Sequence, residues 1–455
     1  MNIVIVGDGK VGFALTDQLA REGHDVTVID SNKLVLQEAQ SSLDINVVHG
    51  NGATLKIQKM ANVPGSDLLI AATSADEINL LCCIMAKKLG CRHTIARVRN
   101  PEYFQQLYLM KEELGLSMMI NPERTAASEI FRLLQFPSFL KRDSFAKGRV
   151  EIVELALRPG SPLIGMKLSQ FHQRGKVKVL VCAVERGQQV FIPDGSFQLE
   201  EGDKLSLTAS SGDLARMLRD LEITQKKVKD AMIIGGSRIA IYLAEELLRA
   251  GVSVKLIEID EARCQLLADV LPKATVIHAD GSSRSVLDSE GLARTDALVT
   301  LTDMDEENLI ISMYANYRGT CKVITKIDRT DFTEALADKG IDCIVSPKEL
   351  CCNDIVRYVR AMGNPKGESV HALHRIVGDR VEALEFHANE KFSRRGQKLA
   401  DLKTRPNTLI ACINRGGKVI FPSGRDCIQA GDIVVVVALS DQVLDDLEDV
   451  FLGER

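Results

Sequence analysis

Residues 3–12 read IVIVGDGKVG, an apolar run followed by glycines in the spacing G-x-G-x-x-G. The apolar run predicts a buried strand, and the residues after the second glycine predict a helix. In such a turn Gly7 permits the tight bend, Gly9 lets a pyrophosphate approach the backbone, and Gly12 lets the helix pack closely on the strand. The free N–H groups at the helix N-terminus attract phosphate. We therefore predict a nucleotide site formed by Gly7, Asp8, Gly9, Lys10, Val11 and Gly12.

Further candidate residues follow the next predicted strands. Asp30 ends the second strand, 23 residues after Gly7. A carboxylate there can bind a ribose 2′-hydroxyl and would repel a 2′-phosphate, which favours NAD(H) or an adenine nucleotide over NADP(H). Because ligands of such sheets lie outside the carboxyl ends of the strands, five more residues join the predicted site: Gly50, Asn51, Thr73, Ser74 and Arg97. Arg97 could pair with phosphate oxygens, or equally be an exposed arginine at a strand end.

The chain repeats itself at an offset of 228 or 229 residues. IVGDGKVG from Ile5 matches IIGGSRIA from Ile233, and HGNGAT from His49 matches HADGSS from His278. Near the C-terminus of each copy, IPDGSFQLEEGD matches FPSGRDCIQAGD. The repeat predicts two related halves, residues 1–228 and 229–455.

Each half divides again. Its first part alternates short apolar strands with amphipathic helices, which predicts a doubly wound, Rossmann-like α/β domain, and its second part has short strands with glycine turns, which predicts a small α+β domain. In the first half the predicted strands of the parallel sheet are Ile3–Val6, Val26–Ile29, Asn46–Val48, Leu68–Ala71, Thr94–Ala96 and Met118–Ile120. The predicted domains are residues 1–140, 145–226, 229–362 and 368–455, with linkers near Ser144–Gly148, Lys226–Lys229 and Gly363–Gly367.

The second glycine stretch differs from the first. Gly235 matches Gly7, but Ser237 and Ala240 replace the other two glycines, and serine adds a Cβ where a pyrophosphate would approach. The sequence leaves open a weak site, a site for a different nucleotide, or a structural role. The candidate residues of this second site are Gly235, Gly236, Ser237, Arg238, Glu258, Asp280, Thr302 and Lys326.

Composition narrows the classes of function. The net charge is −5 and no basic stretch marks a nucleic-acid site, so we expect no nucleic acid as partner. The 11 cysteines show no C-x-x-C spacing, which predicts buried thiols and no metal site. No apolar run approaches the ~18 residues of a membrane span, and the N-terminus shows no leader pattern. We therefore expect a cytoplasmic protein that reaches the inner face of the cell membrane only through a partner.

Several motifs together resemble those of a known family. They are IVIVGDGKVG, HGNGAT, AATSADEINLL, ARVRNPEY, INPERTAASEI and SPLIGMKLSQF. Over essentially its full length the chain resembles the TrkA family of bacterial Trk potassium-uptake systems, built from tandem RCK-N and RCK-C domains. The resemblance implies NAD(H) and often ATP or ADP as ligands, and a ring of four chains docked on a transmembrane potassium-transporting subunit. Ser237 and Ala240 depart from the family pattern in the second lobe.

We expect a regulatory subunit and not an enzyme, in which ligand binding rearranges an oligomeric ring. Hydride transfer needs a positioned general base, and the best histidine, His49, sits at a strand end where packing or a hydrogen bond explains it. The alternatives are an NAD-dependent dehydrogenase and a nucleotide-sensing adaptor of a soluble partner.

Two predicted helices, residues 123–136 and 348–361, are apolar on more than one face, so one sheet cannot cover them. We expect neighbouring lobes of an oligomer to cover them, with Phe131 and Leu134 at the contact between chains. Cover by the small domain is the alternative.

Overall fold

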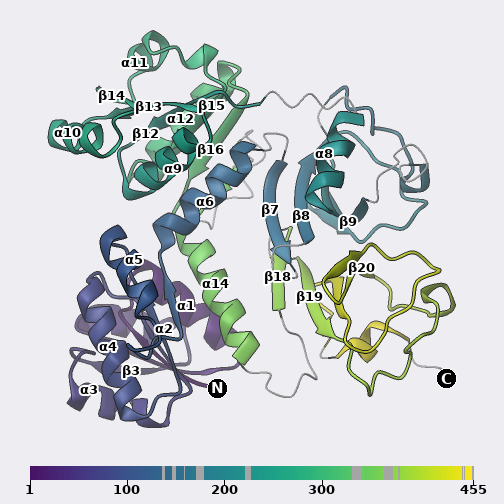
Figure 1. Cartoon of the computed structure of the whole chain (residues 1–455), viewed down its shortest axis with the longest axis horizontal. Coiled ribbons are helices and arrows are strands. Elements are labelled where there is room, and N and C mark those ends of the chain that lie inside the picture. The colour runs from purple at the N-terminus through teal and green to yellow at the C-terminus, as the bar shows by residue number, and fades with distance from the viewer. Residues whose placement is uncertain are drawn as a thin grey trace.

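Four β-sheets organise the chain. The computed structural model describes residues 1–135, 139–145, 150–157, 159–170, 179–220, 227–329, 341, 343–362, 372–377, 380–442, 444 and 446–452. Two Rossmann-like lobes lie one above the other on one side of the molecule, and two small domains lie beside them (Figure 1). The predicted fold class is confirmed. The linkers predicted at 146–148 and 363–367, and the domain boundaries at 226, 368 and 455, lie outside the described residues.

The first lobe is a parallel sheet of six strands in the order β3-β2-β1-β4-β5-β6. The four residues Ile3–Val6 are all buried, because β1 lies at the centre of the sheet with helices over both faces. Each of the six predicted strands is present to within two residues. The elements are β1 (Asn2–Val6), α1 (Lys10–Arg21), β2 (Asp25–Asp30), α2 (Lys33–Ser42), β3 (Asn46–His49), α3 (Leu55–Met60), β4 (Leu68–Ala71), α4 (Asp76–Leu89), β5 (His93–Arg97), α5 (Pro101–Leu109), β6 (Met118–Ile120) and α6 (Pro122–Gln135).

The second lobe repeats this topology in the order β14-β13-β12-β15-β16-β17. In both lobes the strand order reverses beside the glycine turn, which places that turn at the switch point where ligands bind. The elements are β12 (Asp230–Ile234), α9 (Arg238–Arg249), β13 (Ser253–Glu258), α10 (Glu261–Val270), β14 (Thr275–His278), α11 (Arg284–Ser289), β15 (Ala297–Thr300), α12 (Asp305–Tyr317), β16 (Lys322–Lys326), β17 (Ile344–Val345) and α14 (Pro347–Met362).

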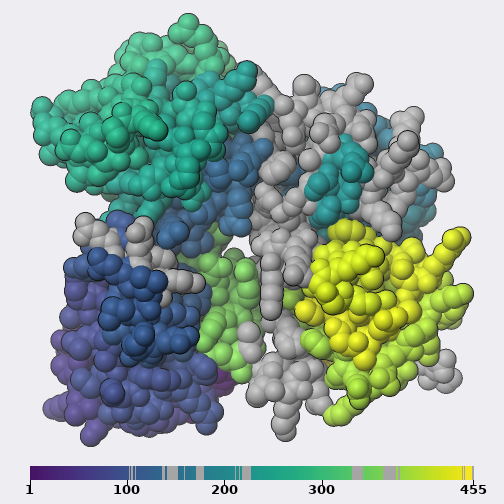
Figure 2. Space-filling model, viewed as in Figure 1, coloured from purple at the N-terminus to yellow at the C-terminus, as the bar shows by residue number. Residues whose placement is uncertain are grey.

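The last helix of each lobe packs on the other lobe. On α6, Ile130, Leu133 and Leu134 belong to the core of the second lobe and pack with α9. On α14, Ile355 and Val359 belong to the core of the first lobe. The two helices also contact each other, and in Figure 1 they meet between the lobes, with α6 running toward the upper lobe and α14 toward the lower one. In the surface view the green α14 lies against the blue first lobe (Figure 2).

This exchange corrects one expectation from the sequence. A neighbouring lobe does cover these helices, as their apolar faces require, but it is the other lobe of the same chain. Leu134 is buried in the second-lobe core and Phe131 packs against it, so they do not form the predicted contact between chains. A partly buried ion pair between Arg360 of α14 and Glu22 at the end of α1 holds the far end of the exchanged helix.

Each small domain contains an antiparallel sheet of five strands, and the two sheets pack together. Ile152 and Cys182 of one domain share a core with Ala383, Cys412 and Val435 of the other. The first domain has β7 (Phe139–Phe145), β8 (Val150–Ala156), β9 (Leu180–Arg186), β10 (Gln189–Phe191), β11 (Lys204–Ala209) and α8 (Ser211–Asp220). The second has β18 (Ala372–Ile376), β19 (Val381–His387), β20 (Thr408–Arg415), β21 (Lys418–Ile420) and β22 (Ile433–Leu439).

Replacing Leu134 by Ala should destabilise the second lobe, although Leu134 belongs to the first half of the sequence. Removing this buried side chain should cost about 2–5 kcal/mol of stability. Hydrogen exchange should then show faster exchange in β12 and α9 and no change in β1. The control is Leu109→Ala, since Leu109 is 83% exposed. If faster amide hydrogen exchange were confined to the first sheet, α6 would not pack on the second lobe as described.

Candidate nucleotide sites in the two lobes

The glycines of the first lobe have three distinct roles. Gly7 has φ +92°, and a Cβ on it would lie 2.8 Å from the backbone nitrogen of Thr73. A Cβ on Gly12 would lie 1.9 Å from the carbonyl oxygen of Gly7, so the helix could not pack where it does. A Cβ on Gly9 would meet no atom within 4 Å. Gly7 and Gly12 are thus required by the fold, whereas Gly9 leaves open space where a ligand can approach the helix N-terminus.

Asp30 anchors the glycine turn to the end of β2. Its Oδ2 accepts a 2.8 Å hydrogen bond from the backbone N–H of Asp8, and its Oδ1 accepts a 2.7 Å bond from that of Asn32. Each oxygen keeps a free lone pair that a ribose hydroxyl could use. Asp8 itself is turned into the protein and is 3% exposed, and burial together with the Asp30 charge raises its pKa to about 6.

An asparagine ties the ends of β4 and β5 together in the first lobe. The Asn79 side chain bonds to the backbone N–H and carbonyl of Thr73 and to the carbonyl of Arg97. Asn308 makes the same bonds with Thr302 and Lys326 in the second lobe. Sequence reasoning did not assign this role, and the recurrence of asparagine in both copies of the repeat was the signal. These bonds position four of the predicted site residues.

The remaining first-lobe candidates line the carboxyl edge of the sheet. Gly50 has φ +151°, and Asn51 caps the following turn by accepting from the N–H of Ala53. Ser74 is exposed after β4. His49 contacts the carbonyl of Ser31 at 3.1 Å, and His278 contacts that of Ile259 at 3.0 Å. The hydrogen-bonding role expected of the repeated histidine is confirmed.

Arg97 is half-buried and only partly bonded. Its Nη1 donates to the Ala72 carbonyl at 3.4 Å, and its Nε is buried with no hydrogen-bond partner among the described residues. Burial and the neighbouring Arg99 lower its pKa. Arg97 points toward the second lobe, where it lines a cavity.

Side-chain hydrogen bonds hold the second-lobe turn, which lacks two of the three glycines of the first. Ser237 is the N-cap of α9, and its hydroxyl accepts from the backbone N–H of Ala240 at 3.4 Å. Glu258 replaces Asp30 and accepts from the N–H of Gly236 at 2.6 Å. Arg263, from α10, donates to the Gly236 carbonyl. The turn thus keeps the shape of the first one while its helix N-terminus is partly capped by its own side chain.

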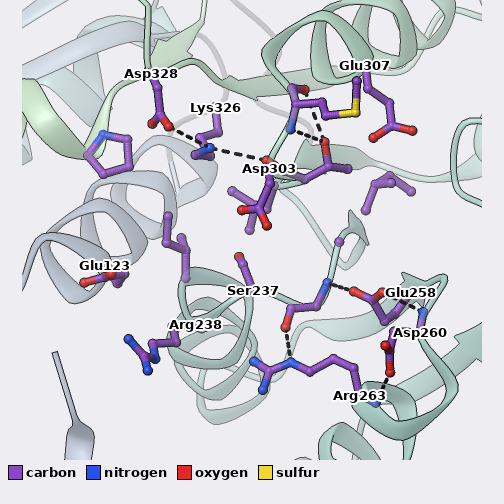
Figure 3. Close-up of a pocket in the computed structure, with 18 of the residues that line it drawn as sticks. Glu123, Ser237, Arg238, Glu258, Asp260, Arg263, Asp303, Glu307, Lys326 and Asp328 are labelled. Atoms are coloured by element: carbon purple, nitrogen blue, oxygen red, sulfur yellow. Dashed lines mark hydrogen bonds and ion pairs between the residues drawn. The ribbon is translucent and has the colours of Figure 1, made fainter. Parts of the chain in front are cut away.

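A cavity of about 1120 Å³ lies over this second turn (Figure 3). All eight candidate residues of the second site line it. The first lobe contributes part of the wall, and three of these residues are first-lobe site candidates, namely Lys10, Val11 and Arg97. Pro122 and Pro347, which begin α6 and α14, also line it. The cavity therefore belongs to both lobes, which the sequence did not predict.

An ion pair joins the two lobes at the cavity. Lys10 Nζ lies 2.7 Å from Asp328 Oδ2, and Lys326 Nζ lies 3.5 Å from the same oxygen. Burial works to raise the pKa of Asp328, but the hydrogen bond from Lys10 and the charge of Lys326 outweigh it and lower the pKa. The hydrogen bond to Asp328 raises the pKa of Lys10. Both groups are therefore charged at neutral pH.

The residues at the equivalent positions of the repeat cannot form a matching ion pair. Arg238 occupies the position of Lys10 in the second lobe, and Arg99 occupies the position of Asp328 in the first. Arg99 is paired with Glu123, and Figure 3 shows Glu123 and Arg238 on the same side of the cavity. One half of the inter-lobe contact is thus an attractive pair, and the other half carries an excess of cations.

Two classes of feature are missing from the described parts of the chain. No group of three or more His, Cys, Asp or Glu side chains there is placed to hold a metal ion. No helix within the same residues has the length and apolar character needed to cross a membrane.

Family comparisons match every part of the repeat. TrkA-N domain models match residues 3–122 and 231–347, and TrkA-C domain models match residues 152–222 and 394–451. The chain belongs to the TrkA family. The TrkA-N matches fall on the two lobes and the TrkA-C matches on the two small domains, which confirms the tandem organisation predicted from the repeat.

Full-length relatives agree with this assignment. The Trk system potassium uptake protein TrkA homolog 1 of Methanosarcina mazei is 32% identical over 452 residues, covering 97% of this chain and 98% of that protein. The Trk system potassium uptake protein TrkA of Halomonas elongata is 29% identical over 456 residues, covering 99% and 98%.

Solved structures share the fold at low sequence identity. The GsuK RCK domain superposes with a TM-score of 0.63 at 18% identity, covering 97% of this chain and 92% of that one. The GsuK channel bound to NAD also gives 0.63 at 18% identity, covering 97% and 77%. The tandem arrangement of TrkA-N and TrkA-C domains therefore corresponds to a known RCK architecture.

Proposed function

We propose that this TrkA-family chain is a cytoplasmic, nucleotide-sensing regulatory subunit that gates a transmembrane potassium transporter of the Trk type. The observation that carries the proposal is the cavity built from both lobes, at which Lys10 of one lobe pairs with Asp328 of the other. A ligand there contacts both lobes at once and can change how they sit. The full-length relatives carry the name of Trk potassium uptake proteins, which supports the choice of partner.

In the first lobe we propose NAD(H) as ligand. Its pyrophosphate would lie over Gly9 at the N-terminus of α1, where the space is open. Its ribose would bond to Asp30, which also explains selection against a 2′-phosphate. Asn51, Thr73 and Ser74 would line the same edge of the sheet.

In the second lobe we propose a smaller adenine nucleotide, ADP or ATP. The Ser237 side chain caps α9, so less of the helix N-terminus is free for a pyrophosphate. Cations from both lobes can bind the phosphates in place of the capped N–H groups, since Lys10, Arg97 and Arg238 all line the cavity. Its volume of about 1120 Å³ accommodates a nucleotide.

The proposed mechanism is a population shift between arrangements of the lobes. A ligand acts only by binding one arrangement better than another. A phosphate near Lys10 competes with Asp328, so it favours an arrangement in which that ion pair is broken. The cavity also touches the first residues of α6 and α14, each of which packs on the opposite lobe. Occupancy of the cavity would thus be transmitted as rigid-body movement.

We propose no catalytic step. The repeated histidines, His49 and His278, bond to backbone carbonyls in the same way in both lobes, which is a structural role. A dehydrogenase would need a base held close to the nicotinamide in one lobe.

Changing Gly9 to Val should abolish NADH binding to the first lobe in a folded protein. The new side chain has room, since nothing lies within 4 Å of its Cβ, but it fills the space proposed for the pyrophosphate. Calorimetry should show NADH binding by the unaltered chain, weaker NADPH binding and loss of the NADH signal in the variant. Gly195→Val, in a small domain with the nearest atom at 3.7 Å, is the matched control. Unchanged NADH affinity in Gly9→Val would sink the assignment.

Cells lacking this chain should take up potassium more slowly. In cells that have it, the Lys10–Asp328 pair should set the nucleotide concentration at which potassium uptake responds. Lys10→Glu should shift the nucleotide concentration needed for half-maximal uptake by about two- to five-fold, the range expected for a partly exposed pair. Adding Asp328→Lys should restore part of the response, because it re-forms the pair between the lobes with its charges reversed. Arg92→Glu, which breaks the exposed pair with Asp67 in one lobe, should leave it unchanged. Normal uptake without the gene would argue for an adaptor of a soluble partner.

We further propose that four chains form a ring through α12. This helix exposes an apolar stripe of Ile310, Met313 and Tyr317, of which Tyr317 is 83% exposed. Exposed apolar stripes of this kind mark contacts with other proteins. Because each chain carries two lobes, a contact between α12 and the first lobe of the next chain can close a ring.

Light scattering should report a mass about four times the 50.0 kDa of one chain. Changing Ile310 and Tyr317 together to Asp should reduce that mass, because two charges would enter an apolar contact. Changing Leu109, exposed on α5, to Asp is the matched control. A mass near that of one chain for the unaltered protein would rule out the ring.

A further inference from the structure

Asp8 is a buried carboxyl inside the loop that the proposed NAD(H) site uses. Its side chain is 3% exposed, and Oδ1 lies 3.8 Å from the position that a Cβ on Gly12 would occupy, directly beneath the glycine turn. The other oxygen, Oδ2, is buried and accepts no hydrogen bond from the described residues. Burying a carboxylate with one oxygen unpaired costs more free energy than burying the neutral acid. The loop therefore raises the pKa of Asp8 above that of an exposed carboxyl group.

The hydroxyl of Thr16 stabilises the ionised form of Asp8 only weakly. Thr16 Oγ1 lies 2.9 Å from the carbonyl oxygen of Gly12 and 3.4 Å from Asp8 Oδ1. The hydroxyl has one proton to donate, and the Gly12 carbonyl can only accept. If Asp8 is protonated, it donates to Thr16 while Thr16 donates to Gly12, and both contacts are hydrogen bonds. If Asp8 is ionised, Thr16 can serve only one of the two.

The charged groups around Asp8 act in the same direction. Burial is the largest effect, and the carboxylates of Asp30 at the end of β2 and Glu38 on α2 add to it. Thr16, from α1, opposes them by donating to the ionised form. The nearby Lys10 turns away to Asp328 in the other lobe. The resulting pKa of about 6 lies close to neutral pH, so modest changes in acidity alter the charge of the loop.

We propose that Asp8 is a proton-binding site coupled to the nucleotide site of the first lobe, so that acidification strengthens dinucleotide binding. The inference rests on the proposed NAD(H) site. A pyrophosphate over Gly9 brings two negative charges close to Asp8 and repels its carboxylate. Binding therefore raises the pKa of Asp8 and takes up a proton.

The direction of the pH dependence follows. Well below pH 6 Asp8 is neutral with or without ligand, so affinity does not change with pH. Above the pKa of the free protein, affinity falls by up to about tenfold per pH unit until the pH exceeds the raised pKa of the complex. The second lobe has Gly236 at the position of Asp8, so this coupling belongs to the first lobe alone.

The test is calorimetric titration of the full-length protein with NADH between about pH 6 and pH 8. NADH is the right probe because its pyrophosphate has no terminal phosphate, whereas a terminal phosphate itself titrates near pH 6. We expect affinity to fall about three- to thirty-fold across this range, within the tenfold-per-unit limit. Repeating the titration in buffers of different ionisation heat should show net proton uptake near pH 7.

Two variants assign the effect to Asp8. Asp8→Asn should bind NADH more tightly than the unaltered protein at pH 8 and should show neither pH dependence nor proton uptake. Thr16→Val removes the donor to the ionised carboxylate, so the fall in affinity should move to higher pH. Asp17→Asn removes the same charge one residue after Thr16, where Asp17 pairs with Arg21 at the surface, and should keep the pH profile.

A melting-temperature measurement tests the ionisation of Asp8 independently of NADH binding, and it also shows whether the variants fold. Because the folded state holds the proton of Asp8 more tightly than the unfolded state, the stability that this proton contributes is lost as the pH rises from the usual carboxyl pKa of 3.8 to about 6, and it stays absent at higher pH. Asp8→Asn should therefore raise the melting temperature more at pH 8 than at pH 5. An unchanged pH profile of NADH binding in Asp8→Asn would overturn the coupling while leaving the NAD(H) site intact. No NADH binding by the unaltered protein at any pH would instead overturn the proposed site itself.

Discussion

The structure depends on apolar helix faces that neither lobe can bury alone. The helices α6 and α14 each follow the sixth strand of one sheet and pack on the helices of the other. Burying a side chain such as Leu134 or Ile355 removes most of its apolar surface from water only when both lobes are present. The core of each lobe is therefore completed by a helix that follows the sheet of the other lobe, although the sequence repeat divides them. The arrangement of the lobes, and everything between them, follows from this exchange.

The exchange also determines where the candidate sites meet. Because Pro122 and Pro347 begin the exchanged helices at the cavity, the cavity is lined by the structural elements that join the lobes. A binding site in that place is coupled to lobe arrangement by its construction. The contact is unequal on its two sides, since Lys10 meets Asp328 while Arg238 stands in the position of Lys10 near a cationic first-lobe surface. In the proposed function, this inequality is what would let the two lobes respond to different ligands.

Local features of the sites could be predicted because they depend on short stretches of chain. A strand, a turn with a positive φ at Gly7 and a close approach at Gly12 are requirements of a few neighbouring residues, and the structure shows all three. The repeat allowed the second site to be predicted from the equivalent positions of the first, and its eight candidate residues all line one cavity. The burial of Asp8, its shared hydroxyl with Thr16 and the bonds of Asn79 were not predicted, because the polar residue types at these positions are equally common on exposed loops.

The sequence by itself determined the two Rossmann-like sheets, the two small domains and the family, because hydrophobic periodicity and glycine spacing are local and recur in both halves. Only the tertiary structure decided which surface covers α6 and α14. An apolar helix face specifies that it must be covered, but it carries no information about which of two similar lobes, in the same chain or another, does so. The same holds for Lys10, whose partner lies 318 residues away in the chain and is brought close only by that packing.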